Sequence, residues 1–118
     1  MTKLASILVV VALLVGACAQ GGDADRPGGE PVENPVITIS GMDFQDGSVV
    51  VEAGATVTWV WDDGSMEHNV ISDEGIFESP LQAEGEWSHT FDEPGTFSYH
   101  CAPHPFMTGV IEVIAAEQ

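Results

Sequence analysis

From residue 36 onward, short runs of alternating apolar and polar residues are separated by turn residues. The apolar positions show no helical period of useful length, whereas β-branched and aromatic residues recur at every second position. Asp, Gly and Pro in the intervening sequences DDGS, DEG and DEPG favour chain reversal. The pattern predicts strands at residues 36–40, 48–53, 55–61, 68–72, 86–91, 96–101 and 109–114. This spacing predicts an all-β domain, an antiparallel β-sandwich or Greek-key barrel of about seven to eight strands.

The same alternation predicts the hydrophobic core, because successive side chains of a strand point to opposite faces of its sheet. Each run then has one face on which its apolar residues gather. For the aromatic residues, packing in the core is the simplest role, and it is preferred here to a role in carrying electrons. The predicted core comprises Val57, Trp59, Trp61, Trp87, Phe91, Phe97, Tyr99, Cys101, Val110 and Ile114.

Residues 1–17 have the features of a signal peptide. Lys3 precedes an apolar run at 4–15, and small residues follow; this run is too short to span a membrane as a mature helix. The ending LVGAC resembles the lipobox of bacterial lipoproteins, so we expect cleavage to leave a lipid-modified Cys18. Two alternatives are an ordinary secretory signal cut nearby and a disulfide between Cys18 and Cys101.

Residues 18–35 predict a flexible, acidic tether that follows the lipidated cysteine. They are rich in Gly, Pro and acidic residues and contain no aromatic residue, so they cannot bury enough surface to fold. A flexible chain of this length has a reach of roughly 20–25 Å. The expected arrangement is an exported domain at 36–118, lipid-anchored to the cell membrane and facing the periplasm or the cell exterior.

The composition is strongly acidic. Nineteen Asp and Glu residues against two Lys and Arg residues give a formal net charge of −17 at pH 7. Removal of the signal peptide takes away Lys3 and leaves Arg26 as the remaining basic residue. This balance excludes nucleic acid as a partner, because a polyanion repels an acidic surface. It suits either a high-salt environment, which screens the charges, or a strongly basic partner.

The segment YHCAPHPFMTG carries the candidate chemistry. Cys101, His104 and Met107 recur at every third position. In an extended strand, residues at that spacing point to opposite faces, so the segment must curl if the three side chains are to converge. Pro103 and Pro105 fix their own φ angles and lack N–H donors. The segment is therefore predicted to be a stiff loop that presents three soft ligands.

A fourth ligand must come from His68, His89 or His100. His100 is adjacent to Cys101 and so lies on the opposite, exposed face of its strand. His89 is interpreted as a structural histidine among aromatic residues. His68 opens a predicted strand after a loop, which suits a site at one end of a barrel.

The resulting set is His68, Cys101, His104 and Met107. Two imidazoles and a thiolate with a weak axial thioether are typical of a blue-copper electron-transfer site. Zinc is a competitor, since two histidines and a cysteine also bind it, but a thioether is a poor zinc ligand. Iron–sulfur clusters need more thiolates than the chain provides.

The sequences EHNV and PGTFSYHCAPHPFMTGVIEV resemble the cupredoxin family, in the group of plastocyanin, pseudoazurin and amicyanin. The Cys-x-x-His-x-x-Met loop with its Pro-His-Pro-Phe centre is most similar to amicyanin, and the resemblance covers residues 36–118. It implies a Greek-key β-sandwich that holds one type 1 copper ion and shuttles single electrons between redox partners such as a dehydrogenase, a cytochrome or an oxidase. His68, Cys101 and His104 would be equatorial ligands and Met107 the axial one. The protein would be a monomer and not an enzyme.

The resemblance also implies a supporting role for Asn69, which would tie the two ligand loops together and donate its backbone N–H to the Cys101 sulfur. Pro103 has no N–H, so a single hydrogen bond to the thiolate is expected. The sequence departs from the family at Glu67, where a proline is common, and at Trp61, where a polar residue is common. The acidity and the lipid anchor are also not expected of amicyanin.

A partner would dock on an apolar patch formed by Met66, Pro103, Pro105 and Phe106 and ringed by acidic residues, because transient redox partners use small interfaces. Two other functions share these residues. One is storage or delivery of copper outside the cytoplasm. The other is an enzyme in which Cys101 is the nucleophile and a histidine is the base. That enzyme would leave Met107 without a role.

Overall fold

The computed structural model describes residues 29–116 of the chain. The predicted signal peptide, Cys18 and the first part of the predicted tether lie outside the described residues. Within the described part, no helix is long and apolar enough to cross a membrane.

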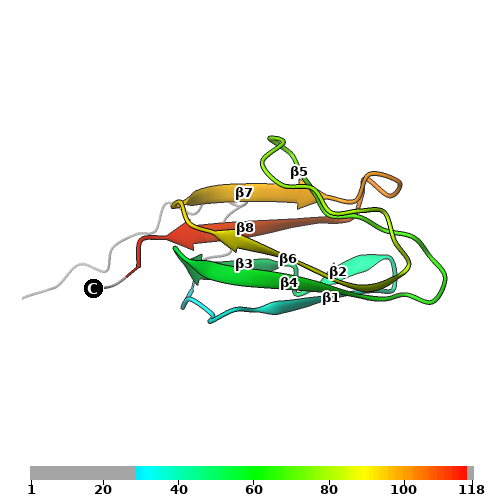
Figure 1. Cartoon of the computed structure of the whole chain (residues 1–118), viewed down its shortest axis with the longest axis horizontal. Coiled ribbons are helices and arrows are strands. Elements are labelled where there is room, and N and C mark those ends of the chain that lie inside the picture. Colours follow the sequence, from blue (N-terminus) through cyan, green and yellow to red (C-terminus); the bar gives the residue numbers. More distant parts are fainter. Residues whose placement is uncertain (1–28, 117–118) are drawn as a thin grey trace, which may run out of the picture.

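The described residues form two four-stranded sheets packed face to face (Figure 1). The strand order is β2-β1-β4-β6 in one sheet and β3-β8-β7-β5 in the other. This is the all-β sandwich that the alternation predicted. The strands are β1 Val36–Ser40, β2 Asp43–Gln45, β3 Ser48–Glu52, β4 Ala55–Asp62, β5 Ile71–Ser72, β6 Glu84–Phe91, β7 Gly95–His100 and β8 Thr108–Ile114.

The sheets are mixed, which corrects the expectation of a purely antiparallel sandwich. Strands β4 and β6 pair antiparallel, as do β7 and β8. However, β1 runs parallel to β4, and β3 runs parallel to β8. The chain changes sheet after each strand from β2 to β6, so most neighbours within a sheet are not consecutive along the chain. Such crossover connections permit parallel pairs, which a tight hairpin cannot make.

The core confirms most of the predicted inward faces. Val57, Trp59 and Trp61 of β4 are buried, and so are Tyr99 and Cys101 at the end of β7. Phe91 is also buried, whereas Trp87 and Phe97 are partly exposed and pack against the edge of the core. The rings of Trp59 and Tyr99 meet edge to face with centroids 5.3 Å apart, an arrangement that adds to the stabilisation from burial.

The predicted inward face of β8 was wrong. Ile111 and Val113 are in the core, whereas Val110 and Ile114 lie on the other face and are partly exposed. The register explains this phase, because Tyr99 pairs with Gly109 and fills the space that a side chain there would need. Residue 109 therefore faces the core, and every second residue after it does too.

Most predicted strands agree with the structure to within two residues at each end, and the larger differences concern β5 and β2. The predicted strand at 68–72 is reduced to Ile71–Ser72, and His68 instead forms an isolated bridge with Gln82. Strand β2 was not predicted; it follows the turn at Gly41 and Met42, both of which have positive φ angles. A three-residue strand carries too little alternation to be recognised from sequence.

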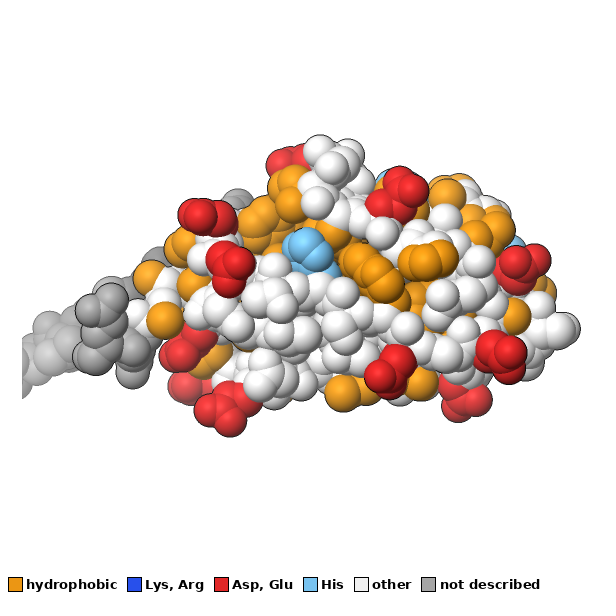
Figure 2. All heavy atoms as spheres, in the orientation of Figure 1, with side chains coloured by type: hydrophobic (Ala, Val, Ile, Leu, Met, Phe, Trp, Pro, Cys, Tyr) orange, Lys and Arg blue, Asp and Glu red, His pale blue; other side chains and the backbone are white. Residues whose placement is uncertain are grey.

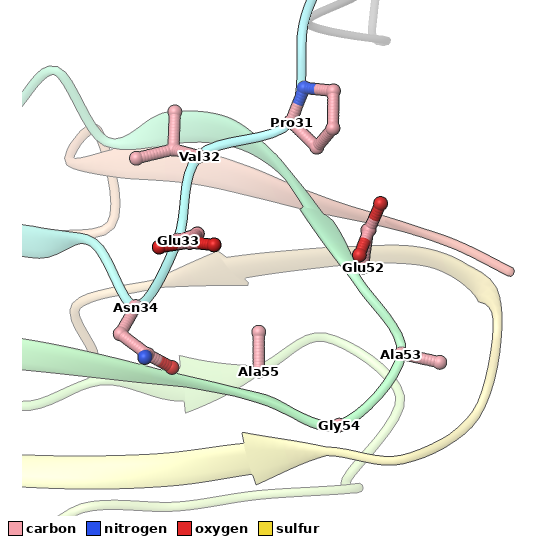
Figure 3. Close-up of a pocket in the computed structure, with 8 residues that line it drawn as sticks. All are labelled: Pro31, Val32, Glu33, Asn34, Glu52, Ala53, Gly54 and Ala55. Carbon is pink, nitrogen blue, oxygen red and sulfur yellow. The ribbon is translucent and has the colours of Figure 1, made fainter. Parts of the chain in front are cut away.

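The fold brings the loops that carry the predicted ligands to one end. The segment that follows β4 and the β7–β8 loop lie at the right-hand end of Figure 1, whereas the described N-terminal residues lie at the opposite end. There, Val32 N–H donates to Val50 O at 2.8 Å, and Thr56 N–H donates to Asn34 Oδ1 at 2.9 Å. Residues 31–34 and 52–55 line an open pocket of about 480 Å³ at that end (Figure 3).

Candidate metal centre

The β7–β8 loop curls, as its spacing required. The N–H of Cys101 donates to the carbonyl of Met107 at 3.1 Å, and the N–H of Met107 donates to the carbonyl of His104 at 2.9 Å. These two bonds close the loop and leave His104 at its turn. Pro103 and Pro105 flank His104 and are exposed, so their missing N–H groups leave no buried donor site empty. The loop therefore presents Cys101, His104 and Met107 on a short, closed segment.

The sulfur atoms of this loop are shut away from solvent, whereas His104 is not. Cys101 is a free thiol with no exposed surface, Met107 is 1% exposed, and His104 is partly exposed. Two residues before Cys101, the hydroxyl of Tyr99 donates to the carbonyl of Gly47 at 2.6 Å. Burial raises the pKa of Tyr99, so this hydroxyl stays a neutral donor. The bond ties the end of β7 to the turn before β3.

His68 is held by its backbone from two sides. Its N–H and carbonyl pair with Gln82 at 2.9 and 3.1 Å, and the indole N–H of Trp61 donates to the same carbonyl at 2.8 Å. Trp61, one of the departures from the family pattern, thus supports a predicted ligand. The His68 side chain has no exposed surface, and its Nδ1 lies 3.6 Å from Cys101 Sγ. The rings of His68 and His104 have centroids 5.0 Å apart.

Asp63 completes the surroundings of His68, and the sequence analysis missed it. Its Oδ2 lies 2.7 Å from His68 Nε2. The carboxylate also accepts the N–H groups of Gly41 and Met42, each at 3.1 Å. The hydrogen bond with His68, followed by those with the turn, lowers the pKa of Asp63. The sequence signal was weak, because an aspartate in the segment DDGS is equally typical of a simple turn.

Asn69 ties the two loops together, as the resemblance implied. Its Oδ1 accepts the N–H of Ala102 at 2.7 Å, which joins the residue after His68 to the residue after Cys101. The additional hydrogen bond expected from the Asn69 N–H to the Cys101 sulfur stays a prediction.

The comparisons with known proteins agree with this geometry. The sequence profile of the copper-binding proteins of the plastocyanin/azurin family matches residues 33–114. The chain belongs to this family. It is 38% identical over 84 residues to amicyanin of Paracoccus denitrificans, a match that covers 66% of this chain and 63% of that protein. It is also 33% identical over 119 residues to amicyanin-alpha of Methylorubrum extorquens, covering 96% of this chain and 99% of that one.

A solved structure of a reduced amicyanin variant superposes on this plastocyanin/azurin-family domain with a TM-score of 0.62 and 35% sequence identity. The match covers 72% of this chain and 87% of that one. The two domains therefore share their fold.

The donor atoms gathered at this end of the plastocyanin/azurin-family domain suit copper. A thiolate, two imidazoles and a thioether are softer donors than the oxygen atoms preferred by Mg²⁺ or Ca²⁺. Within residues 29–116, however, no three side chains drawn from His, Cys, Asp and Glu lie in an arrangement that could hold a metal ion. His104 is the partly exposed member of the proposed donor set.

The other two histidines lie outside this cluster. His100 is on the opposite face of β7 from Cys101, where its Nδ1 lies 2.6 Å from Asp73 Oδ1 and its side chain is 32% exposed. His89 of β6 packs against the rings of Phe77 and Phe91, with centroids 5.0 and 4.7 Å away. Burial lowers the pKa of His89, in keeping with the structural role predicted for it.

Apolar side chains are exposed around the predicted ligands. Phe106 is 68% exposed and Met66 is 43% exposed, and the rings of Phe106 and His104 have centroids 6.1 Å apart. Pro103 and Pro105 are exposed as well. At the right-hand end of Figure 2, hydrophobic side chains lie among separate acidic ones.

Proposed function

We propose that this domain is a blue-copper electron carrier that exchanges single electrons with redox partners outside the cytoplasm. His68, Cys101 and His104 are its equatorial copper ligands, and Met107 is its weak axial ligand. The observation that carries the proposal is the pairing of Cys101 Sγ with His68 Nδ1 at 3.6 Å, with both side chains fully buried. A buried thiol facing a buried imidazole, beside a second imidazole and a thioether, is the donor set of a type 1 copper site.

A bound copper ion supplies a one-electron couple, Cu(I)/Cu(II), and the chain supplies a rigid and dry setting for it. Cys101, His68 and Met107 exclude water because they have almost no exposed surface. The closed β7–β8 loop and the bridge of His68 to Gln82 hold the donors with little freedom to rearrange. A partner can approach the partly exposed edge of His104.

The surface around His104 is the proposed docking patch, formed by Met66, Pro103, Pro105 and Phe106. Its exposed apolar side chains fit a small, transient interface. Residues 29–116 contain no Lys or Arg, so acidic groups provide the charge around it and a basic partner is favoured. Electron donors and acceptors of this kind include dehydrogenases, cytochromes and oxidases. Both relatives described above are named amicyanins.

For the location of the protein, we propose export by the signal peptide at 1–17 and a lipid anchor at Cys18, with a monomeric domain. Of the predicted tether at 18–35, Val32 and Asn34 are hydrogen-bonded to the sandwich, so the proposed tether is the part that precedes them. The described N-terminal residues lie at the end of the sandwich opposite the ligand loops (Figure 1). An anchored domain could therefore turn its docking patch away from the membrane.

The two rival functions are less well supported. Storage or delivery of copper requires release to a recipient, yet two of the proposed donor side chains are fully buried. A nucleophilic enzyme requires a substrate to reach Cys101, which has no exposed surface. A thiol shut into the core is better suited to holding a metal than to attacking a substrate.

The deciding experiment is a spectrum of the protein after addition of Cu(II). We expect the intense blue thiolate-to-copper charge-transfer band, and we expect Cys101→Ser to abolish it because the thiolate is its source. Cys18→Ser is the matched control: it should keep the band but release the protein from the membrane fraction. A colourless copper complex in the wild type would count against the electron carrier, and a Cys18→Ser protein that stays with the membrane would count against the anchor.

A further inference from the structure

The side chain of Asp63 connects His68, a predicted copper ligand, to the turn between β1 and β2. Asp63 follows the end of β4, and its carboxylate makes three hydrogen bonds. One joins Oδ2 to His68 Nε2 at 2.7 Å. In the other two, the carboxylate accepts the N–H groups of Gly41 and Met42. The side chain of Asp63 is 19% exposed, whereas that of His68 is fully buried. The carboxylate therefore meets Nε2 of His68, whereas Cys101 Sγ lies near the other ring nitrogen, Nδ1.

These contacts determine which nitrogen of His68 carries the hydrogen. An ionised carboxylate has no hydrogen to give and can only accept. Nε2 must therefore be the N–H donor in the neutral ring, which leaves Nδ1 with a free lone pair. Nδ1 is the atom that lies 3.6 Å from Cys101 Sγ. The pair of contacts thus presents the unprotonated nitrogen to the thiol.

We propose that Asp63 is a positioning residue of the copper site, whose carboxylate fixes the tautomer and the ring orientation of His68 before a metal binds. The proposal rests on the copper site proposed above and adds a residue to it. Groups that orient a ligating histidine are as much a part of a metal site as the ligands, since their loss typically weakens metal binding about 10- to 100-fold.

The turn at Gly41 and Met42 gives the carboxylate its own fixed position. Both residues have positive φ, 59° and 58°, and their N–H groups point to Asp63. A second histidine–aspartate pair, His100 with Asp73, shows the contrast. In this pair, the side chain of His100 is 32% exposed and that of Asp73 is 50% exposed. The restraint expected at His68 is therefore stronger, because water competes less for its hydrogen bond.

The test compares Asp63→Asn with Asp63→Ala, and Asp62→Asn serves as the control. In Asp63→Asn, the single amide oxygen can take the place of Oδ2, which accepts from both His68 Nε2 and Met42 N–H, while the NH₂ group replaces Oδ1 beside Gly41. This conservative variant therefore loses the Gly41 bond but keeps the acceptor that fixes the tautomer of His68. Asp63→Ala removes all the contacts. Asp62 is exposed at the end of β4, so Asp62→Asn removes the same charge without touching His68.

Two measurements read the effect. Nitrogen-15 NMR of the metal-free protein should show His68 as the Nε2–H tautomer in the wild type and in Asp62→Asn. It should show a mixture of tautomers in Asp63→Ala and the Nε2–H tautomer in Asp63→Asn. Competition with a chromophoric Cu(I) chelator should show copper affinity lowered about 10- to 100-fold in Asp63→Ala, largely restored in Asp63→Asn, and unchanged in Asp62→Asn.

The outcomes separate this inference from the proposed function. A blue wild type whose Asp63→Ala variant keeps both the Nε2–H tautomer and the copper affinity would eliminate the role of Asp63 alone. A wild type that binds no copper would eliminate the copper site, and the role of Asp63 with it. If Asp63→Ala fails to fold, the wild type still decides the question, because an Nδ1–H tautomer of His68 in the metal-free protein would contradict the proposal.

Discussion

The two ends of the sandwich differ in how tightly they are packed. At the ligand end, His68 and Cys101 are fully buried, and the ring of Tyr99 occupies all the space beside Gly109. At the opposite end, an open pocket of about 480 Å³ lies between the described N-terminal residues and the β3–β4 turn. A side chain added at Gly54 there would meet no atom within 4 Å. One fold thus combines a tightly packed end, which fixes the positions of the predicted ligands, with an open end that has space for an added side chain.

The largest expected effect on stability comes from filling the tight end. A Cβ at Gly109 would clash with the Tyr99 ring and the Gly47 carbonyl, and neither the buried ring nor the backbone can move freely. We expect Gly109→Ala to lower the free energy of unfolding by about 3 kcal/mol or more, as in overpacked cores. Urea unfolding of the metal-free protein measures this directly.

Gly54→Ala is the matched change at the open end. Gly54 has φ of +97° and free space around it, so its cost comes only from the backbone conformation, about 1–2 kcal/mol. Equal losses of stability in the two variants would show that the difference in packing between the ends has no energetic consequence.

The next effect in size concerns docking. Phe106→Gln removes an exposed aromatic ring beside His104 without changing the net charge, so loss of its contact should slow electron exchange with a basic c-type cytochrome about tenfold. This corresponds to roughly 1.4 kcal/mol of docking energy. Stopped-flow kinetics measures the rate, and a small inorganic oxidant, which needs no protein interface, should react as before.

Val32→Gln is the control at the opposite end, where Val32 is 47% exposed. It removes an apolar side chain far along the sandwich from His104 and should leave the cytochrome rate unchanged. If Val32→Gln slows the reaction as much as Phe106→Gln does, the docking patch is not confined to the ligand end.

The sequence predicted the fold well wherever one strand face is clearly polar. Strand β4 alternates Thr with Val and Trp, so its inward face was predicted correctly. Strand β8 has apolar residues on both faces, and the wrong face was chosen. Glu112 shares the phase of Val110 and Ile114, and weighting that charge would have favoured Ile111 and Val113. The parallel pairs were not predictable, because alternation carries no information on which strands become neighbours.

The candidate site was predictable to the extent that its residue types are chemically unusual. Cys101, His104 and Met107 stand out because a thiol, an imidazole and a thioether recur at a fixed spacing. Asp63 does not stand out, since its contact with His68 depends on how the chain turns after β4. Trp61 looked like a departure from the family, and only the structure shows its indole N–H bonded to the His68 carbonyl.

The smallest expected effect lies between the two ends, at His89. Its burial among aromatic rings lowers its pKa below the usual 6.5, and the charge of Asp92 opposes this in part. The unfolded chain therefore binds a proton more readily than the folded one. The stability of the folded protein then falls as the pH drops through about 6.5 toward the lower folded pKa, and the contribution of neutral His89 to stability is fully present above that range.

His89→Gln cannot take up this proton, so its urea-unfolding free energy should fall less between about pH 7 and pH 5 than that of the wild type. The rings that pack on His89 are those of Phe77, Trp87 and Phe91. Gly109→Ala and Gly54→Ala change neither His89 nor these rings and should keep the wild-type pH dependence; a changed slope in either variant would mean that the corresponding end and the rings around His89 are coupled.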